Sequence, residues 1–201
     1  MRLKRWLKKM FSLKLLMSYF IVFMMLGSVL GFVLSERMSS PDRIRYNNYR
    51  IEIAQNRFIV DYHRQKLEFL FPPTELEFFI VPEGMIENFV RVNYFTLSYD
   101  PRMQDNGELG YLRHILFEYS YLVNKLMGFG VTEESIIYDG FNVITCEDST
   151  LESPVIIFKD GDDNIEYDDE TGCTIVSSSN AMHRVQFAEK LLYHILGIME
   201  V

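Results

Sequence analysis

The sequence predicts an α+β domain with a mixed β-sheet and at least two covering helices, preceded by one N-terminal transmembrane helix. Three observations support this prediction: an uncharged run near the N-terminus, alternating apolar residues that favour strands, and apolar residues three and four positions apart that favour helices. The chain has 201 residues, 48% hydrophobic and 24% charged, as in globular proteins. The expected order along the chain is a basic tail (1–14), the transmembrane helix (15–34), a stalk (35–47) and an extracytoplasmic domain (48–201).

The segment Leu15–Leu34 is the predicted transmembrane helix because it contains no charged residue. Its twenty residues would span about 30 Å as a helix, the thickness of the bilayer's hydrocarbon core. Six basic residues and no acidic residue lie within 1–34, so the positive-inside rule predicts a single-pass protein of the cell membrane, with a cytoplasmic N-terminus and the C-terminal domain outside. The alternative is a cleaved signal peptide, whose apolar region usually runs only about 7–15 residues.

Gly27 and Gly31 form a GxxxG match inside this segment. Such a motif allows two membrane helices to approach closely, so an oligomer could form through these glycines. The alternative is a single helix that contacts only lipid.

Residues 35–201 carry 14 basic and all 28 acidic side chains, a formal charge of −14. Phosphate binding needs a basic surface, so this composition argues against a nucleic-acid partner.

Strands are expected where apolar and polar residues alternate. Alternation over 48–71 predicts a meander, and residues 93–99 predict a further strand before Asp100-Pro101. Short strands are expected near Ile136–Tyr138, Val143–Cys146, Val155–Phe158, Ile165–Tyr167 and Cys173–Ser177.

Two helices are expected in the same domain. The first is about twenty residues long; Asp105 or Asn106 would cap it, and Gly128 and Gly130 would stop it. Its apolar stripe comprises Leu112, Ile115, Leu116, Tyr119, Leu122, Val123 and Leu126. Ser179 or Asn180 would cap the last helix, whose stripe comprises Val185, Ala188, Leu191, Leu192, Ile195 and Met199.

Cys146 and Cys173 are the two cysteines of the chain. An even count on predicted strands outside the membrane favours a disulfide, which would stabilise the fold by roughly 3–4 kcal/mol. The alternatives are two unpaired thiols or a catalytic thiol. Adjacent acidic residues disfavour the reactive thiolate form.

The acidic run 160–170 begins like a calcium-binding loop, with candidate oxygen ligands at Asp160, Asp162 and Asn164. The match then fails, because Ile165 stands where glycine belongs and Thr171 where a bidentate glutamate belongs. The alternative interpretation is a solvated acidic turn between two strands.

The last third of the chain resembles small single-span archaeal membrane proteins of unassigned function, through Ile144–Asp148, Ser153–Gly161, Gly172–Val176 and Leu191–Ile198. This resemblance implies an archaeal cell envelope and no mechanism. Ser153–Gly161, followed by a strand and a terminal helix, is also similar to the C-terminal half of a thioredoxin fold. The chain departs from that fold because it has no CxxC motif and because a strand at Cys173–Val176 intervenes.

No sequence motif for nucleotide binding, metalloprotease or serine-hydrolase chemistry occurs, and no cofactor is expected. The leading hypothesis is therefore a non-enzymatic envelope protein that binds a protein partner, with Phe78, Phe79 and Ile80 as candidate contact residues. One alternative is a thiol–disulfide or other enzyme on the outer face of the membrane. The other is a module that binds calcium or a small ligand through the acidic run.

Overall fold

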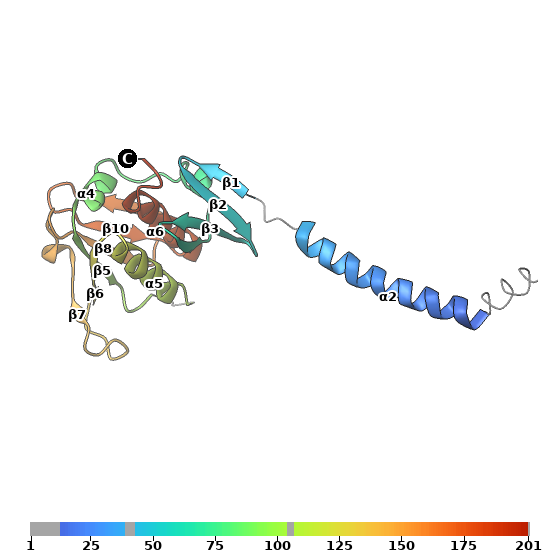
Figure 1. The fold of residues 1–201 in the computed structure, drawn as a ribbon. Coiled ribbons are helices and arrows are strands. Elements are labelled where there is room, and N and C mark those ends of the chain that lie inside the picture. Colours follow the sequence, from blue (N-terminus) through green and yellow to red (C-terminus); the bar gives the residue numbers. More distant parts are fainter. Residues whose placement is uncertain (1–12, 39–42, 104–106, 201) are drawn as a thin grey trace, which may run out of the picture. The chain divides into compact units, whose positions relative to one another are not determined.

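The computed structural model describes residues 13–38, 43–103 and 107–200 (Figure 1). The chain divides into two compact units, Met1–Asp42 and Arg43–Val201. The predicted basic tail (1–14) lies almost entirely outside the described residues, as do residues 39–42 of the predicted stalk.

The described part of the first unit is helix α2 (Leu13–Met38), whose side chains are described over residues 17–29. Within the part of the chain that the structure describes, no helix is both long enough and apolar enough to cross a membrane. The prediction of a transmembrane helix at Leu15–Leu34 is corrected accordingly, and the predicted single-pass location in the cell membrane with it. Pairing of two copies through Gly27 and Gly31 stays a prediction.

The second unit begins with a four-stranded antiparallel meander in the order β1-β2-β3-β4. Its strands are Arg43–Tyr46, Tyr49–Ala54, Arg57–Tyr62 and Gln65–Phe69. Two-residue turns join them, and Gln55 and Asn56 both have positive φ, as the twist of such tight hairpins requires. The predicted meander is confirmed, although it begins at Arg43, inside the segment expected to be a stalk.

A six-stranded mixed sheet follows, in the order β7-β6-β5-β8-β10-β9. Its strands are β5 (Tyr94–Tyr99), β6 (Leu126–Val131), β7 (Asn142–Val143), β8 (Val155–Lys159), β9 (Asn164–Tyr167) and β10 (Thr174–Ser177). Neighbouring strands are parallel except β9, which pairs antiparallel with β10. The α+β class and the mixed sheet are therefore confirmed.

The helices of this unit are α3 (Pro73–Leu76), α4 (Met85–Arg91), α5 (Glu108–Tyr121) and α6 (Ala181–Ile195), with a short 3-10 helix η1 at Cys146–Asp148. Helices α5 and α6 contact each other (Figure 1). Helix α6 also packs against both sheets. Its Phe187 ring meets Phe158 of β8 at 5.9 Å, and its Tyr193 ring stacks on Phe69 of β4 at 4.2 Å. It is consequently buried on almost every side.

The long helix predicted to reach Leu126 was extended too far. Helix α5 ends at Tyr121, Asn124 adopts a left-handed conformation, and Leu126 starts β6. Gly128 and Gly130 lie within that strand, where a side chain on Gly130 would collide with Ile144. The predicted caps Asp105 and Asn106 lie outside the described residues.

The strand expected near Ile136–Tyr138 is absent from the described structure, where residues 132–141 form an irregular loop. The expected strand Val143–Cys146 is reduced to the two residues of β7, and Cys146 belongs to η1. In the loop, the Tyr138 ring packs edge-on against Tyr99 at 5.0 Å. Burial of this aromatic ring, rather than backbone pairing, therefore fixes the segment.

Candidate functional site

The segment between β4 and α4 contains the three predicted contact residues, Phe78, Phe79 and Ile80. Its backbone is held by Lys190 of α6, a buried residue whose ammonium donates hydrogen bonds to the carbonyls of Leu76 (2.9 Å) and Phe79 (2.7 Å). Burial lowers the pKa of Lys190. The Leu76 carbonyl also accepts a hydrogen bond from the Phe79 N–H at 3.1 Å, so the ammonium adds a second bond at the end of the short helix α3 and ties the turn that follows it.

Of the three predicted contact residues, one points inward and two point outward. The Phe79 ring lies 5.0 Å from the His183 ring and packs against the core. Phe78 and Ile80 are 84% and 89% exposed, so each presents nearly its whole side chain to solvent. We refer to Phe78 and Ile80 as the apolar pair.

Acidic residues accompany the apolar pair along the chain. Glu75, Glu77 and Glu83 are all exposed. Burial, together with the neighbouring Glu77 carboxylate, raises the pKa of Tyr46 to about 12. The sequence surrounding the apolar pair is therefore negatively charged.

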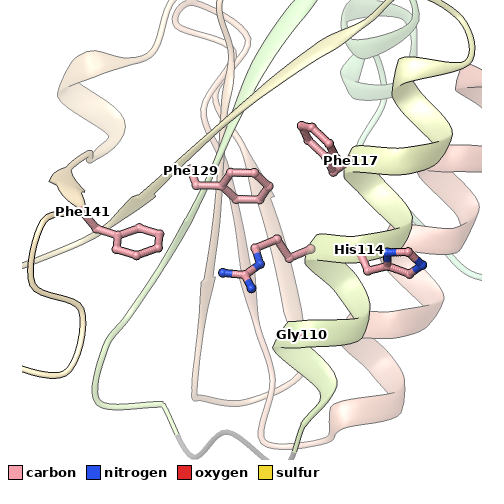
Figure 2. Close-up of a pocket in the computed structure, with 6 residues that line it drawn as sticks. Gly110, His114, Phe117, Phe129 and Phe141 are labelled. Carbon is pink, nitrogen blue, oxygen red and sulfur yellow. The ribbon is translucent and has the colours of Figure 1, made fainter.

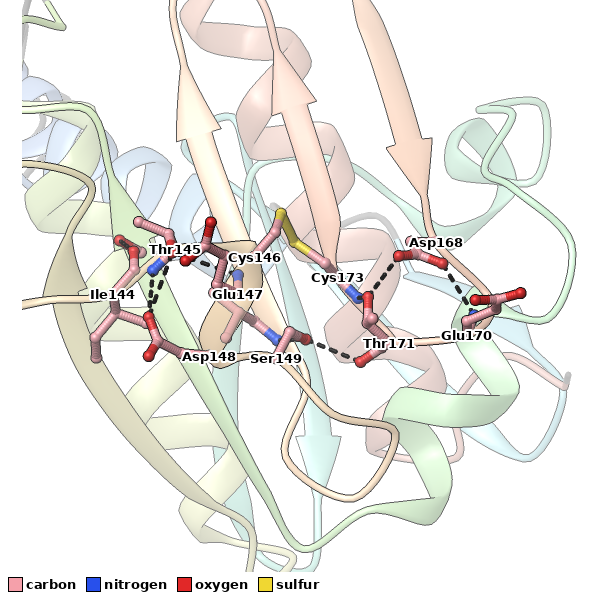
Figure 3. Close-up of a disulfide and its surroundings, with 12 residues drawn as sticks. Ile144, Thr145, Cys146, Glu147, Asp148, Ser149, Asp168, Glu170, Thr171 and Cys173 are labelled. Atoms are coloured by element: carbon pink, nitrogen blue, oxygen red, sulfur yellow. Dashed lines mark hydrogen bonds between the residues drawn. A yellow bond between two sulfur atoms is a disulfide. The ribbon is translucent and has the colours of Figure 1, made fainter.

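Cys146 and Cys173 form the predicted disulfide, with Cα atoms 5.4 Å apart (Figure 3). The bridge joins η1 to the start of β10 on the face of the sheet where Val155 and Ile157 of β8 are buried. Thr145 and Asp148 cap η1 reciprocally, which fixes the backbone on either side of Cys146. Because Cys173 is buried, an external thiol has little access to its sulfur. This geometry favours a structural disulfide over a disulfide that exchanges with substrate thiols, as the thiol–disulfide enzyme hypothesis would require.

Removing the bridge by a combined Cys146→Ala and Cys173→Ala substitution is expected to lower the free energy of unfolding by about 3–4 kcal/mol. The reason is that the unfolded chain regains the freedom of a loop that closes residues 27 positions apart. Urea unfolding of the wild type with and without reductant, beside the variant, measures this loss. Equal stability of the variant and the oxidised wild type would contradict it.

Of the three candidate calcium ligands, Asp160 and Asp162 lie in the loop after β8 and Asn164 is the first residue of β9. Asp160 accepts a hydrogen bond from Arg184 at 3.1 Å, and Asn164 donates one to Glu166 at 2.9 Å. Asp162 is exposed. Over residues 13–38, 43–103 and 107–200, no group of three or more His, Cys, Asp or Glu side chains could hold a metal ion. The structure therefore does not assemble a ligand set around these three residues.

Lys190 could not be identified from the sequence, although it holds the backbone that displays the apolar pair. Lysine is almost always exposed, and the two carbonyls that it binds lie 111 and 114 positions earlier in the chain. No local pattern identifies such a pairing. The only hint is that Lys190 directly precedes two residues of the apolar stripe, Leu191 and Leu192.

Comparison with known proteins identified no relative: no family model, no curated protein and no solved structure matches this chain. The resemblances to archaeal single-span proteins and to the thioredoxin fold stay predictions. The geometry of the described residues is therefore the basis for a functional proposal.

Proposed function

We propose that the unit beginning at Arg43 is a non-enzymatic interaction module that binds a protein partner through the apolar pair, Phe78 and Ile80. The observation that carries this proposal is the double hydrogen bond from Lys190, which holds the backbone that displays the pair. When a partner covers a large apolar side chain that is exposed to solvent, burial of its surface stabilises the complex.

The rigidity of the segment favours binding over chance exposure. Its backbone is tied at Leu76 and Phe79, and the inward Phe79 ring fixes the orientation of the residues on either side. A preorganised surface loses little conformational entropy when a partner docks.

The acidic residues indicate the chemistry of the partner surface. Glu75, Glu77 and Glu83 would meet a rim that carries lysine or arginine around an apolar centre. Attraction between such exposed charges is screened by salt, so association should slow as ionic strength rises.

Substituting Phe78→Ser together with Ile80→Ser in the full chain is expected to reduce recovery of the cross-linked partner at least tenfold. Burial of each side chain contributes about 1.5–3 kcal/mol to association, and serine removes that contribution. The measurement is quantitative mass spectrometry after affinity purification and chemical cross-linking in the native host.

The matched control is Ile136→Ser with Ile137→Ser, because these isoleucines are 98% and 80% exposed on a different loop. Both double variants should melt at the wild-type temperature, since neither removes a buried contact. Undiminished recovery with the Phe78 and Ile80 variant would overturn the proposal. Loss confined to the control variant would instead place the contact on the loop of residues 132–141.

A further inference from the structure

A separate cleft of about 330 Å³ lies between helix α5 and the β7 edge of the mixed sheet. Gly110 and Phe117 of α5 contribute one wall, Phe129 of β6 the centre, and Phe141, directly before β7, the opposite wall (Figure 2). Apart from its two chain neighbours and the backbone of its own helix, no atom of the described residues lies within 4 Å of the position that a Cβ on Gly110 would occupy. The absence of a side chain at this position leaves that part of the cleft open.

Arg113 supplies the positive charge of the cleft. Its guanidinium carbon lies 5.9 Å from the centre of the Phe129 ring, a cation–π arrangement. His114 also borders the cleft, but its ring points away from Phe129 and Phe141 (Figure 2). None of the residues lining the cleft is acidic, and no carboxylate among the described residues forms a salt bridge with Arg113.

The far wall of the cleft is held in place by a cluster of three aromatic rings. Phe141 packs against Tyr138 at 6.0 Å and against Tyr99 of β5 at 6.5 Å. The cluster anchors the loop to the sheet, so the separation between Phe141 and helix α5 is set before any ligand binds. Such preorganisation reduces the entropic cost of binding.

We propose that this cleft binds a carboxylate carried by an aromatic group. The planar guanidinium of Arg113 matches a carboxylate through two parallel hydrogen bonds, and the phenylalanine rings offer faces and edges for an aromatic ring. A single positive charge balances a monoanion. A dianionic phosphate would bring one unbalanced negative charge to residues 35–201, whose net charge is already −14. The volume accommodates a group of about the size of one aromatic amino acid.

The test is ligand-observed NMR titration of the full chain with N-acetyl-L-phenylalanine and with its uncharged amide. We expect the carboxylate to bind with a dissociation constant of about 1 mM, as suits so small a ligand, and the amide to bind at least tenfold more weakly. Phenylpropanoate serves as a third probe. If it binds as tightly as N-acetyl-L-phenylalanine, a free aromatic acid is a sufficient ligand. If it binds at least tenfold more weakly, the ligand is the C-terminal residue of a peptide.

Two variants locate the binding. Arg113→Gln is expected to weaken carboxylate binding at least tenfold, whereas Arg91→Gln, which removes the same charge from an exposed position on α4, should leave it unchanged. Gly110→Leu should abolish binding by filling the cleft and should raise the melting temperature, because leucine favours a helix. Equal affinity for carboxylate and amide would overturn the proposal. So would no binding of either compound at 10 mM (about tenfold above the expected constant), or full binding by Arg113→Gln.

Discussion

Replacing Arg184 by methionine is expected to lower the free energy of unfolding by about 4–5 kcal/mol. Arg184 is only 2% exposed and forms an ion pair with Glu108, itself buried at the start of α5. It also donates to the carbonyl of Ser178 and, at 3.1 Å, to Asp160. Methionine approximates the arginine stem in volume, so most of the loss comes from leaving the Glu108 carboxylate buried without its cation.

Arg102→Met is the matched control, because Arg102 also faces two carboxylates, Asp100 at 3.2 Å and Glu133 at 3.0 Å. Arg102 is 74% exposed, however, and exposed ion pairs contribute at most about 1 kcal/mol. Urea unfolding of both variants shows whether the loss of stability depends on burial of the arginine or only on the number of carboxylates that it faces. A loss with Arg184→Met no larger than with Arg102→Met would show that the buried pair contributes little. A further Glu108→Leu substitution in Arg184→Met should restore part of the stability by removing the unpaired carboxylate.

Much of the fold could be predicted from the sequence because local patterns determine it. Alternation over 48–71 predicts the meander, which the structure confirms. Ser179 or Asn180 is the expected cap of the last helix, and the Asn180 side chain accepts a hydrogen bond from the backbone N–H of Met182. These features depend on residues a few positions apart, which a sequence displays directly.

The errors arose where distant residues decide local structure. Leu126 continues the helical stripe of α5, yet it starts a strand because Asn124 has left the helix and β6 pairs with β5. Gly128 and Gly130 suggest the end of a helix, but they lie within β6, where neighbouring side chains leave no room for a Cβ. Pairing across the sheet overrides such short-range signals.

The candidate sites were harder to predict than the fold. Phe78, Phe79 and Ile80 could be proposed as contact residues, but the sequence indicated neither that Phe79 points inward nor that Lys190 holds the backbone of the segment. Arg184 and Glu189 lie on the same helix and are also buried, with partners up to 119 positions away. Charged residues are usually exposed, so nothing in the local sequence indicates that these three charged residues of α6 are buried.

Glu189 carries the other large expected effect, because its carboxylate is fully buried between α6 and the end of β4. One oxygen accepts hydrogen bonds from the Leu70 N–H at 2.8 Å and the Tyr111 hydroxyl at 2.6 Å, and the other accepts one from the Phe71 N–H at 2.9 Å. Burial raises the pKa of Glu189 to about 7, and the three hydrogen bonds oppose that rise only in part. Burial raises the pKa of Tyr111, and the neighbouring Glu189 carboxylate raises it further.

The raised pKa predicts that Glu189 makes the protein less stable as the pH rises from about 4.5 to about 7. In that window the folded chain retains a proton that the unfolded chain has already released, so alkalinity favours unfolding. Glutamine does not titrate, so only the wild type has this pH dependence. Between pH 5 and pH 8 we therefore expect the wild type to lose about 2–3 kcal/mol of unfolding free energy relative to Glu189→Gln. Urea unfolding at both pH values measures the shift.

Comparison with the variant is needed because another buried group acts in the opposite direction. Burial lowers the pKa of His194, so this residue adds stability as the pH rises through its titration range. It is present in both proteins, and its contribution cancels in the difference. Glu52→Gln provides a second reference: hydrogen bonding to Lys66 lowers the pKa of Glu52, so its contribution is lost only below about pH 4.5. The difference in unfolding free energy between wild type and Glu189→Gln could prove as independent of pH between pH 5 and pH 8 as that for Glu52→Gln. This result would contradict the prediction, because it would mean that its three hydrogen-bond donors keep Glu189 ionised in the folded protein at pH 5.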